Sequence, residues 1–130
     1  MLCPMVNEKR GLKGRLGEDI AKKYLEKQGY KIISQNFRTK TGEIDLIAEK
    51  KGTLVFVEVK AGCLGKDDFP PEDKVNYLKR KRLIEASRLF CAKEKKLMDR
   101  IREFRYDVLI VDLEKRRVVR HYESAFFVED

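Results

Sequence analysis

Residues 42–60 have the sequence GEIDLIAEKKGTLVFVEVK, which predicts two strands joined by a tight turn at Lys51-Gly52. Alternate residues of a strand share a face, so the valines of the second strand form one apolar face. The opposite face carries Phe56, Glu58 and Lys60, and it therefore begins apolar and ends in a carboxylate beside an ammonium group.

The segments on either side of this hairpin predict a mixed α/β domain. Helical spacing of apolar residues indicates a helix over residues 15–28, which ends at Gly29. The order α-β-β-β-α-β-β predicts a central mixed sheet flanked by helices, in a single domain over residues 14–130 after a flexible basic leader at residues 1–13. The other expected elements are strands at 31–37, 43–49, 53–60, 104–113 and 117–123, a loop at 61–73 and a helix at 73–95.

The net charge of the chain indicates which classes of partner to expect. The chain has 130 residues and a formal net charge of +8, which favours polyanions, with nucleic acid ahead of an acidic membrane surface. Residues 76–105 hold 11 of the 30 basic and 4 of the 22 acidic side chains, which suits either a localised binding surface or a solvated lysine-rich helix.

No apolar run approaches the roughly 20 residues of a membrane span. Three widely spaced cysteines without a CxxC motif favour reduced thiols, so we expect a cytoplasmic protein with no membrane partner.

Asp45, Glu58 and Lys60 come together if the polar faces of the two central strands coincide. Two carboxylates on neighbouring strands can hold magnesium, which prefers oxygen ligands. The metal would lower the pKa of a bound water and stabilise charge on a phosphate, and the lysine would position the water or neutralise the phosphate. The alternative is a cross-strand salt bridge at the end of the sheet.

Both predicted helices place a charged residue beside an apolar stripe. Glu18 falls next to Ala21 and Leu25, from where it can lean over the sheet as a further metal or water ligand, or simply interact with the helix amino terminus. Lys79 falls on the apolar face of the second helix, where it either snorkels to the rim or points a second cation at the carboxylates or at substrate phosphate.

Four other residues have simpler interpretations. His121, the sole histidine, is expected at the surface or in a satisfied hydrogen bond, and Asp107 is interpreted as a buried, hydrogen-bonded acid. Cys91 fits a small core position. Arg38 precedes the acidic strand and either reaches phosphate or belongs to a charged turn.

Several of these motifs together resemble the YraN-like family, over residues 12–126. That family is described as predicted endonucleases of the PD-(D/E)XK, restriction-endonuclease-like superfamily, and it is similar to archaeal Holliday-junction resolvases. The chain has Ile44, as the family does, where the superfamily name has proline, and Ala61 where the family usually has arginine. The matching motifs are Gly17-Glu18, Asn36-Phe37-Arg38, GEIDLIA at 42–48, FVEVK at 56–60, a helix with Lys79, and Asp107-Val108.

The resemblance implies a restriction-endonuclease-like fold and Mg²⁺ or Mn²⁺ as the cofactor, with no small-molecule cofactor. It implies that Asp45, Glu58 and Glu18 bind the metal and that Lys60 assists the attacking water. Glu43 belongs to the same signature as a supporting residue. The residues expected to bind nucleic acid are Lys79, Arg38, Arg80 and Arg82.

Two functions follow from different classes. The first is a metal-dependent endonuclease that hydrolyses phosphodiester bonds of nucleic acid, with branched or recombination-intermediate DNA as the expected substrate. A junction substrate would suit a homodimer. The second is a non-catalytic nucleic-acid-binding or adaptor domain that keeps the nuclease fold.

Overall fold

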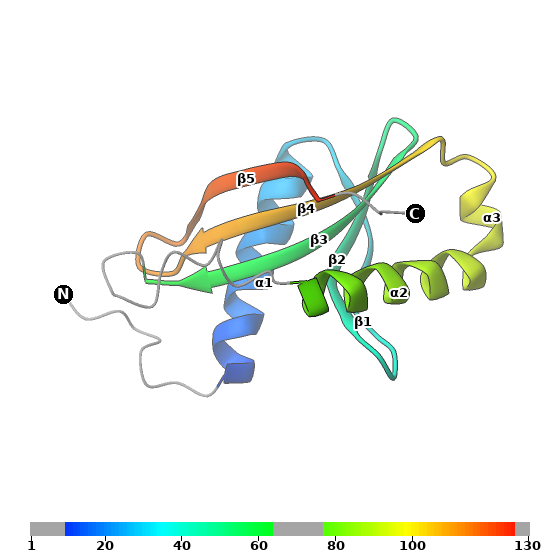
Figure 1. Ribbon diagram of the computed structural model, residues 1–130. Helices are drawn as coiled ribbons and strands as arrows, with labels where there is room; N and C mark the ends of the chain where they lie inside the picture. The colour runs from blue at the N-terminus through cyan, green and yellow to red at the C-terminus, as the bar shows by residue number, and fades with distance from the viewer. Residues whose placement is uncertain (1–9, 64–76, 127–130) are drawn as a thin grey trace.

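A five-stranded mixed sheet with a helix packed on each face forms the core of the molecule (Figure 1). The computed structural model describes residues 10–63 and 77–126. The predicted element order is confirmed, with one addition, a short helix after the second long one. The elements are α1 (Arg10–Lys27), β1 (Lys31–Arg38), β2 (Glu43–Lys50), β3 (Thr53–Gly62), α2 (Tyr77–Lys93), α3 (Lys95–Met98), β4 (Glu103–Asp112) and β5 (Arg117–Phe126).

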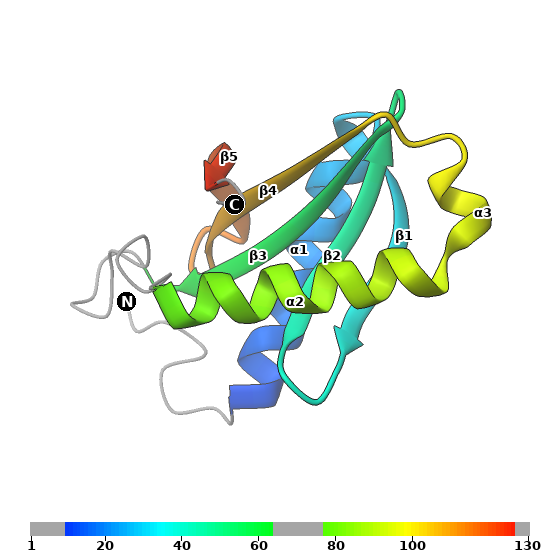
Figure 2. The ribbon, with the colours of Figure 1, turned by 45° about the vertical axis from the view of Figure 1, so that its right-hand side comes forward.

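The strands lie in sequence order across the sheet, and only β3 and β4 run parallel. A parallel pair needs a crossover connection, which α2 provides. Turning the molecule shows α2 in front of the sheet and α1 behind it (Figure 2). The two central strands that carry the candidate site are therefore enclosed from both sides.

Hydrophobic burial on both faces follows the strand alternation predicted for β3. The valines at 55 and 57 are fully buried on the α1 face, and Phe56 lies on the α2 face. The α2 face also buries Ile44, Ile47, Leu54, Leu83, Ala86, Phe90, Leu97, Tyr106, Val108, Ile110 and Phe126. The α1 face buries Ala21, Leu25, Leu46, Ala48, Cys63, Leu109, Val111 and Leu113.

The tight turn predicted between β2 and β3 is confirmed. Lys51 and Gly52 both have positive φ, at 50° and 83°, as a two-residue hairpin turn requires. This turn fixes the β2–β3 register, in which Lys50 lies opposite Thr53.

Element boundaries differ from the prediction at the amino terminus. Helix α1 begins at Arg10, so it includes residues 10–13, which we expected in the leader. Gly11 and Gly14 lower the helix propensity of this stretch, and propensity is only a weak prior. The rest of the leader, most of the loop predicted at 61–73 and the start of the helix predicted at 73–95 lie outside the described residues.

The expectation of reduced thiols throughout is wrong for Cys63, which is disulfide-bonded. Cysteine pairing depends on which parts of the chain meet in space, and the spacing of three residues does not carry that information. Cys91 is a free thiol, partly buried against the core of the α2 face as predicted. Among the described residues, no helix is long and apolar enough to cross a membrane.

Candidate functional site

The site begins where β2 and β3 separate. Their paired residues end at Leu46 opposite Val57, although both strands continue. Beyond this pair, the amide of Val59 donates a hydrogen bond of 2.8 Å to Oδ2 of Asp45. The Asp45 carboxylate thus accepts the hydrogen bond of a β3 amide that β2 no longer pairs with. We call this place, where β2 and β3 separate beyond Leu46 and Val57, the fork.

Three carboxylates converge at this fork. Glu18 from α1 and Glu43 and Asp45 from β2 each offer one oxygen, and these oxygens lie within 4.8 Å of one another. Burial raises the pKa of Asp45 well above its usual range, and the negative charge of Glu58 adds to this effect. Burial also raises the pKa of Glu18. Without a cation, the charged forms of these two carboxylates are therefore disfavoured, which is the condition that a divalent cation relieves.

Asn36 supports this cluster through an unusual backbone. It lies in β1 between Gln35 and Phe37, which pair with Leu46 and Ile44 of β2, and this places it opposite Asp45. Its φ is 53°. Asparagine is one of the few residues that tolerate this left-handed region. Its side chain hydrogen-bonds the Glu18 carboxylate and partly lowers the pKa that burial raises. Sequence reasoning assigned no role to Asn36, although it lies in one of the matched motifs.

Glu58 binds two lysines at the same fork. Its Oε1 atom lies 2.8 Å from Nζ of Lys79 and 3.4 Å from Nζ of Lys60. Burial, together with the neighbouring Lys79 ammonium, lowers the pKa of Lys60. Burial alone would lower the pKa of Lys79 as well, but the charge of Glu58 raises it. Of the two interpretations of Lys79, the structure supports the cation aimed at the carboxylates.

The five residues predicted for the carboxylate and lysine cluster all line one groove of about 1650 Å³, and so does Glu43, which was predicted as a supporting residue. The structure groups the carboxylates differently from the prediction, however. Glu43 takes the place expected for Glu58 in the set able to hold a metal, because Glu58 points at the two lysines. The residues concerned are Glu18, Asp45, Glu58, Lys60 and Lys79.

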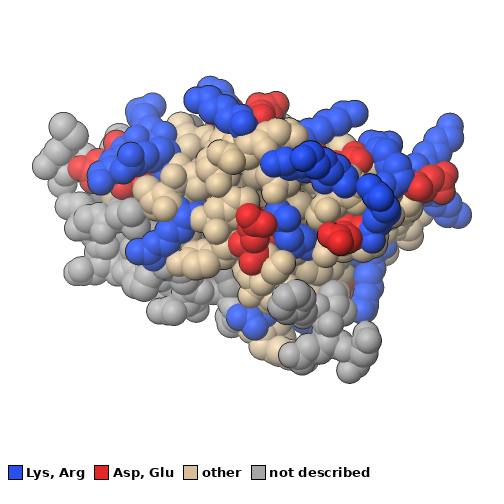
Figure 3. Space-filling model, turned by 90° about the horizontal axis from the view of Figure 1, so that it is seen from above, with Lys and Arg blue, Asp and Glu red and all other residues tan. Residues whose placement is uncertain are grey.

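Basic side chains border the groove. Arg38 lies 3.6 Å from Glu43, and Arg82 lines the α2 side. Arg80 is not brought to the groove: it is one residue beyond Lys79, about 100° around the helix, and its guanidinium lies over the Phe126 ring. Seen from above relative to the view of Figure 1, Lys and Arg are spread widely over the described surface, with Asp and Glu among them (Figure 3). The excess charge on that face forms no single patch.

A second buried network lies away from the groove, behind β4. Asp107 accepts hydrogen bonds of 2.9 Å from Nε and from one terminal nitrogen of Arg105, and its Oδ2 lies 2.7 Å from Nε2 of His121. The hydroxyl of Tyr24 lies 2.9 Å from Nδ1 of the same histidine. The predictions of a buried acid and a satisfied histidine are confirmed. This network ties α1 to β4 and β5.

Comparison with known proteins assigns the chain to a family. Residues 17–111 match the model of UPF0102, described as an uncharacterised protein family. The chain belongs to UPF0102. It is 41% identical to a UPF0102 protein of Alkaliphilus oremlandii over 87% of this chain and 96% of that protein. It is 38% identical to a UPF0102 protein of Syntrophotalea carbinolica, over 89% and 92% of the two chains. The resemblance to the YraN-like family is confirmed to this extent, and the UPF0102 match spans every carboxylate and lysine of the fork.

Proposed function

We propose that this UPF0102 chain is a metal-dependent endonuclease that hydrolyses phosphodiester bonds of DNA. The observation that carries the proposal is the fork itself. Three carboxylates with oxygens within 4.8 Å of one another lie in the same groove as two lysines bound to a buried fourth carboxylate. A pure binding surface has no need of such a cluster, because phosphate is attracted by positive charge alone.

Each residue of the fork has a role that its surroundings support. Glu18, Glu43 and Asp45 would hold Mg²⁺ or Mn²⁺, since the donors are all carboxylate oxygens. The bound ion would supply an activated water and stabilise charge on the phosphate. Lys60 and Lys79 would neutralise a substrate phosphate, and Glu58 holds both ammonium groups in place. The resemblance to the PD-(D/E)XK superfamily implies a metal at Glu18 and Asp45 as well, and in our proposal Glu43 replaces Glu58 as the third metal ligand.

The substrate that we expect follows from the part of the nucleic acid that the groove can contact, which is the sugar–phosphate backbone. The described basic residues of the groove, such as Arg38 and Arg82, suit phosphates, which carry no sequence information. We therefore expect selectivity for DNA structure, and branched DNA in particular, over selectivity for sequence. The non-catalytic adaptor is the outcome that remains if binding occurs without cutting.

The test is cleavage of labelled four-way junction, flap, single-stranded and duplex DNA, with an RNA control, in magnesium, manganese or EDTA. Asp45→Asn and Lys60→Ala should abolish metal-dependent cutting. Asp19→Asn and Lys23→Ala, which remove an exposed ion pair on the same chain, serve as matched controls and should cut normally. Equal cutting by all variants would reveal a contaminant, and binding without cutting under every condition would contradict the nuclease.

A further inference from the structure

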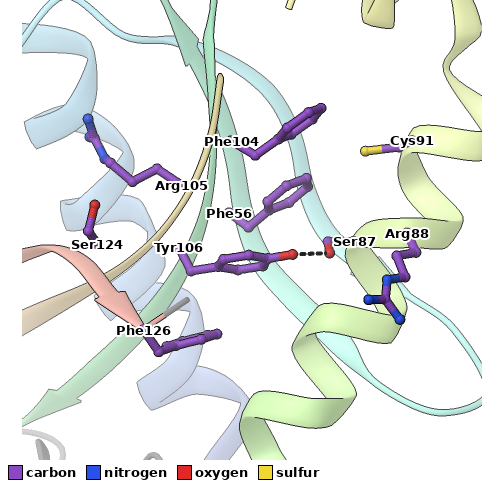
Figure 4. Close-up of a pocket in the computed structure, with 9 residues that line it drawn as sticks. All are labelled: Phe56, Ser87, Arg88, Cys91, Phe104, Arg105, Tyr106, Ser124 and Phe126. Carbon is purple, nitrogen blue, oxygen red and sulfur yellow. Dashed lines mark hydrogen bonds between the residues drawn. The ribbon is translucent and has the colours of Figure 1, made fainter. Parts of the chain in front are cut away.

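A second pocket lies on the α2 face of the sheet, on the other side of the helix from the groove. Helix α2 packs mainly over β1 and β2, and the pocket lies beside it over β3, β4 and β5. The pocket between that part of the sheet and α2 has a volume of about 450 Å³ (Figure 4). This is within the range of small-ligand sites, about 300–1,000 Å³.

Four aromatic rings line this pocket as one column. Phe104 is stacked on Phe56 with 8° between the ring planes, Phe56 on Tyr106 with 28°, and Tyr106 on Phe126 with 21°. The centroids of neighbouring rings are 5.0–6.4 Å apart. Figure 4 shows the rings one above another, facing α2. Such a series of near-parallel rings presents stacking surface to a planar ligand.

The two ends of the column differ. At one end, the guanidinium of Arg80 lies over Phe126, 5.6 Å from the ring centroid. At the other end, Phe104 is 53% exposed, although the next three rings are at most 8% exposed. A further planar group can therefore extend the column at Phe104, and there it would bury apolar surface that now faces solvent.

Polar and charged groups give this pocket a preference for an anionic partner. Arg88 of α2 lines it, and its charge acts on Tyr106, whose hydroxyl lies 2.6 Å from Oγ of Ser87. Helix α2 as a whole carries six basic side chains and one acidic one. An aromatic column beside a basic helix is the combination that binds single-stranded nucleic acid, where bases stack on rings and cations track phosphates.

The pocket and the fork share one strand. Phe56 lies under the pocket and Glu58 lies at the fork, on the same face of β3 and two residues apart, which is roughly 7 Å. Helix α2, about 10–12 Å across with its side chains, lies between the two places. A nucleic-acid strand advances about 3.4 Å per stacked base, and more when it is extended. A strand that crosses α2 can thus reach both places within a few nucleotides.

We propose that this pocket binds an unpaired nucleobase of the substrate, stacked on Phe104, with Arg88 beside the adjoining phosphate. The inference rests on the proposed function in that it takes the ligand to be nucleic acid, and it adds a requirement for unpaired bases near the cleaved bond. Flaps and single-stranded ends supply such bases, and a continuous duplex does not.

The experiment measures binding without cleavage, in the Asp45→Asn protein with EDTA. The probes are single-stranded DNA and the same strand in a duplex, each with 2-aminopurine at one position along the series. We expect quenching of 2-aminopurine at one or two adjacent positions of the single strand. Phe104→Ala should remove the quenching and weaken single-strand binding about 5-fold or more, with duplex binding unchanged. Phe104→Trp should retain both properties.

Two further measurements distinguish base stacking on Phe104 from a general effect of losing an exposed apolar side chain. Leu89→Ala removes an exposed apolar side chain of α2 that does not line the pocket, with 49% exposure against 53% for Phe104, and it should change nothing. Cys91 lines the pocket as a free thiol, so single-stranded DNA should slow its alkylation by iodoacetamide, as followed on its own peptide by mass spectrometry.

The results distinguish this pocket from the nuclease. Quenching that Phe104→Ala removes supports the pocket even if the parent protein cuts no substrate. Single-strand affinity equal in Phe104→Ala and Leu89→Ala overturns the pocket even if the parent cuts DNA. A fall from dimer to monomer in Phe104→Ala, with DNA binding unchanged, overturns it in favour of an interface between copies. No binding of single-stranded DNA overturns the pocket, whereas the nuclease is decided by the cleavage assay alone.

Discussion

Gly17 brings α1 against β3, and we expect Gly17→Ala to disturb both packing and the carboxylate cluster. A Cβ atom at residue 17 would lie 2.5 Å from Cβ of Ala61, whereas ordinary contact lies at 3.4–4 Å. Helix and strand must therefore separate by about 1 Å locally. Glu18 follows directly in the helix, so its carboxylate would move relative to Glu43 and Asp45, which belong to the sheet.

The expected size follows from two opposing effects. Alanine favours a helix interior by about 1 kcal/mol over glycine. Overpacking a well-filled contact costs about 1–3 kcal/mol. Gly14→Ala supplies the matched control, since a Cβ there meets no neighbour within 4 Å in the described part of the chain. Gly14→Ala should therefore stabilise the protein by up to about 1 kcal/mol, and Gly17→Ala should lie about 1–3 kcal/mol below it.

The assay is urea unfolding of the parent, both single variants and the double variant Gly17→Ala/Ala61→Gly. Removing the Cβ of Ala61 relieves the contact, so the two substitutions should be non-additive, with the double variant more stable than the sum predicts. Magnesium should raise the melting temperature of Gly14→Ala as in the parent and raise that of Gly17→Ala less. If Gly17→Ala stabilises as much as Gly14→Ala and responds equally to magnesium, the close approach of α1 to β3 is refuted.

Three further predictions concern other parts of the structure. Asn36→Gly should keep stability within about 0.5 kcal/mol and reduce the magnesium-induced rise in melting temperature, because the left-handed backbone is retained and the hydrogen bond to Glu18 is lost. Asn36→Ala should cost about 1 kcal/mol more in urea unfolding, and equal stability of the two variants would speak against the left-handed conformation. Burial alone would raise the pKa of Asp107, but its hydrogen bonds outweigh burial and lower the pKa in the folded chain. The ionised carboxylate therefore stabilises the fold at pH values above the unfolded pKa of about 4. This stabilisation is lost as the pH falls through the lower pKa of the folded chain. In urea unfolding, Asp107→Asn should be about 3 kcal/mol less stable than the parent at pH 7. Its stability should also change less than that of the parent between pH 7 and pH 3, and parallel plots of stability against pH would contradict the network. Gly42→Ala should lower stability by about 1–3 kcal/mol in the same assay, since its Cβ would lie 2.7 Å from the backbone oxygen of Arg82, and an unchanged value would contradict that contact.

Strand alternation made most of the fold predictable. The valine face of β3 and the Lys51-Gly52 turn fix which side chains face each layer and which residues pair across the hairpin. The period of a strand is two, so one correct register assigns a face to every residue. The start of α1 was not predictable in the same way, because glycines near a helix end are decided by tertiary packing.

The site was predictable as a neighbourhood and less so as a set of ligands. Alternation places Glu58 and Lys60 on one face, and the hairpin brings them near Asp45, as the groove confirms. The pattern assumes regular strands, whereas β2 stops pairing with β3 on the amino-terminal side of Leu46, and the backbone of Asn36 is left-handed. Those two irregularities decide which carboxylates meet, and neither has a periodic signature in the sequence.

The fork links the stability of the fold to the function that we propose for it. Had β2 and β3 continued to pair, the amide of Val59 would bond to backbone and Asp45 would have no fixed position. Instead, the fold holds Asp45 and Glu18 close together and partly buried, with pKa values raised in the absence of a cation. That arrangement lowers stability, and a bound cation would remove the repulsion. A cation that binds the folded chain must stabilise it by mass action, so magnesium-dependent unfolding examines the cluster without any substrate.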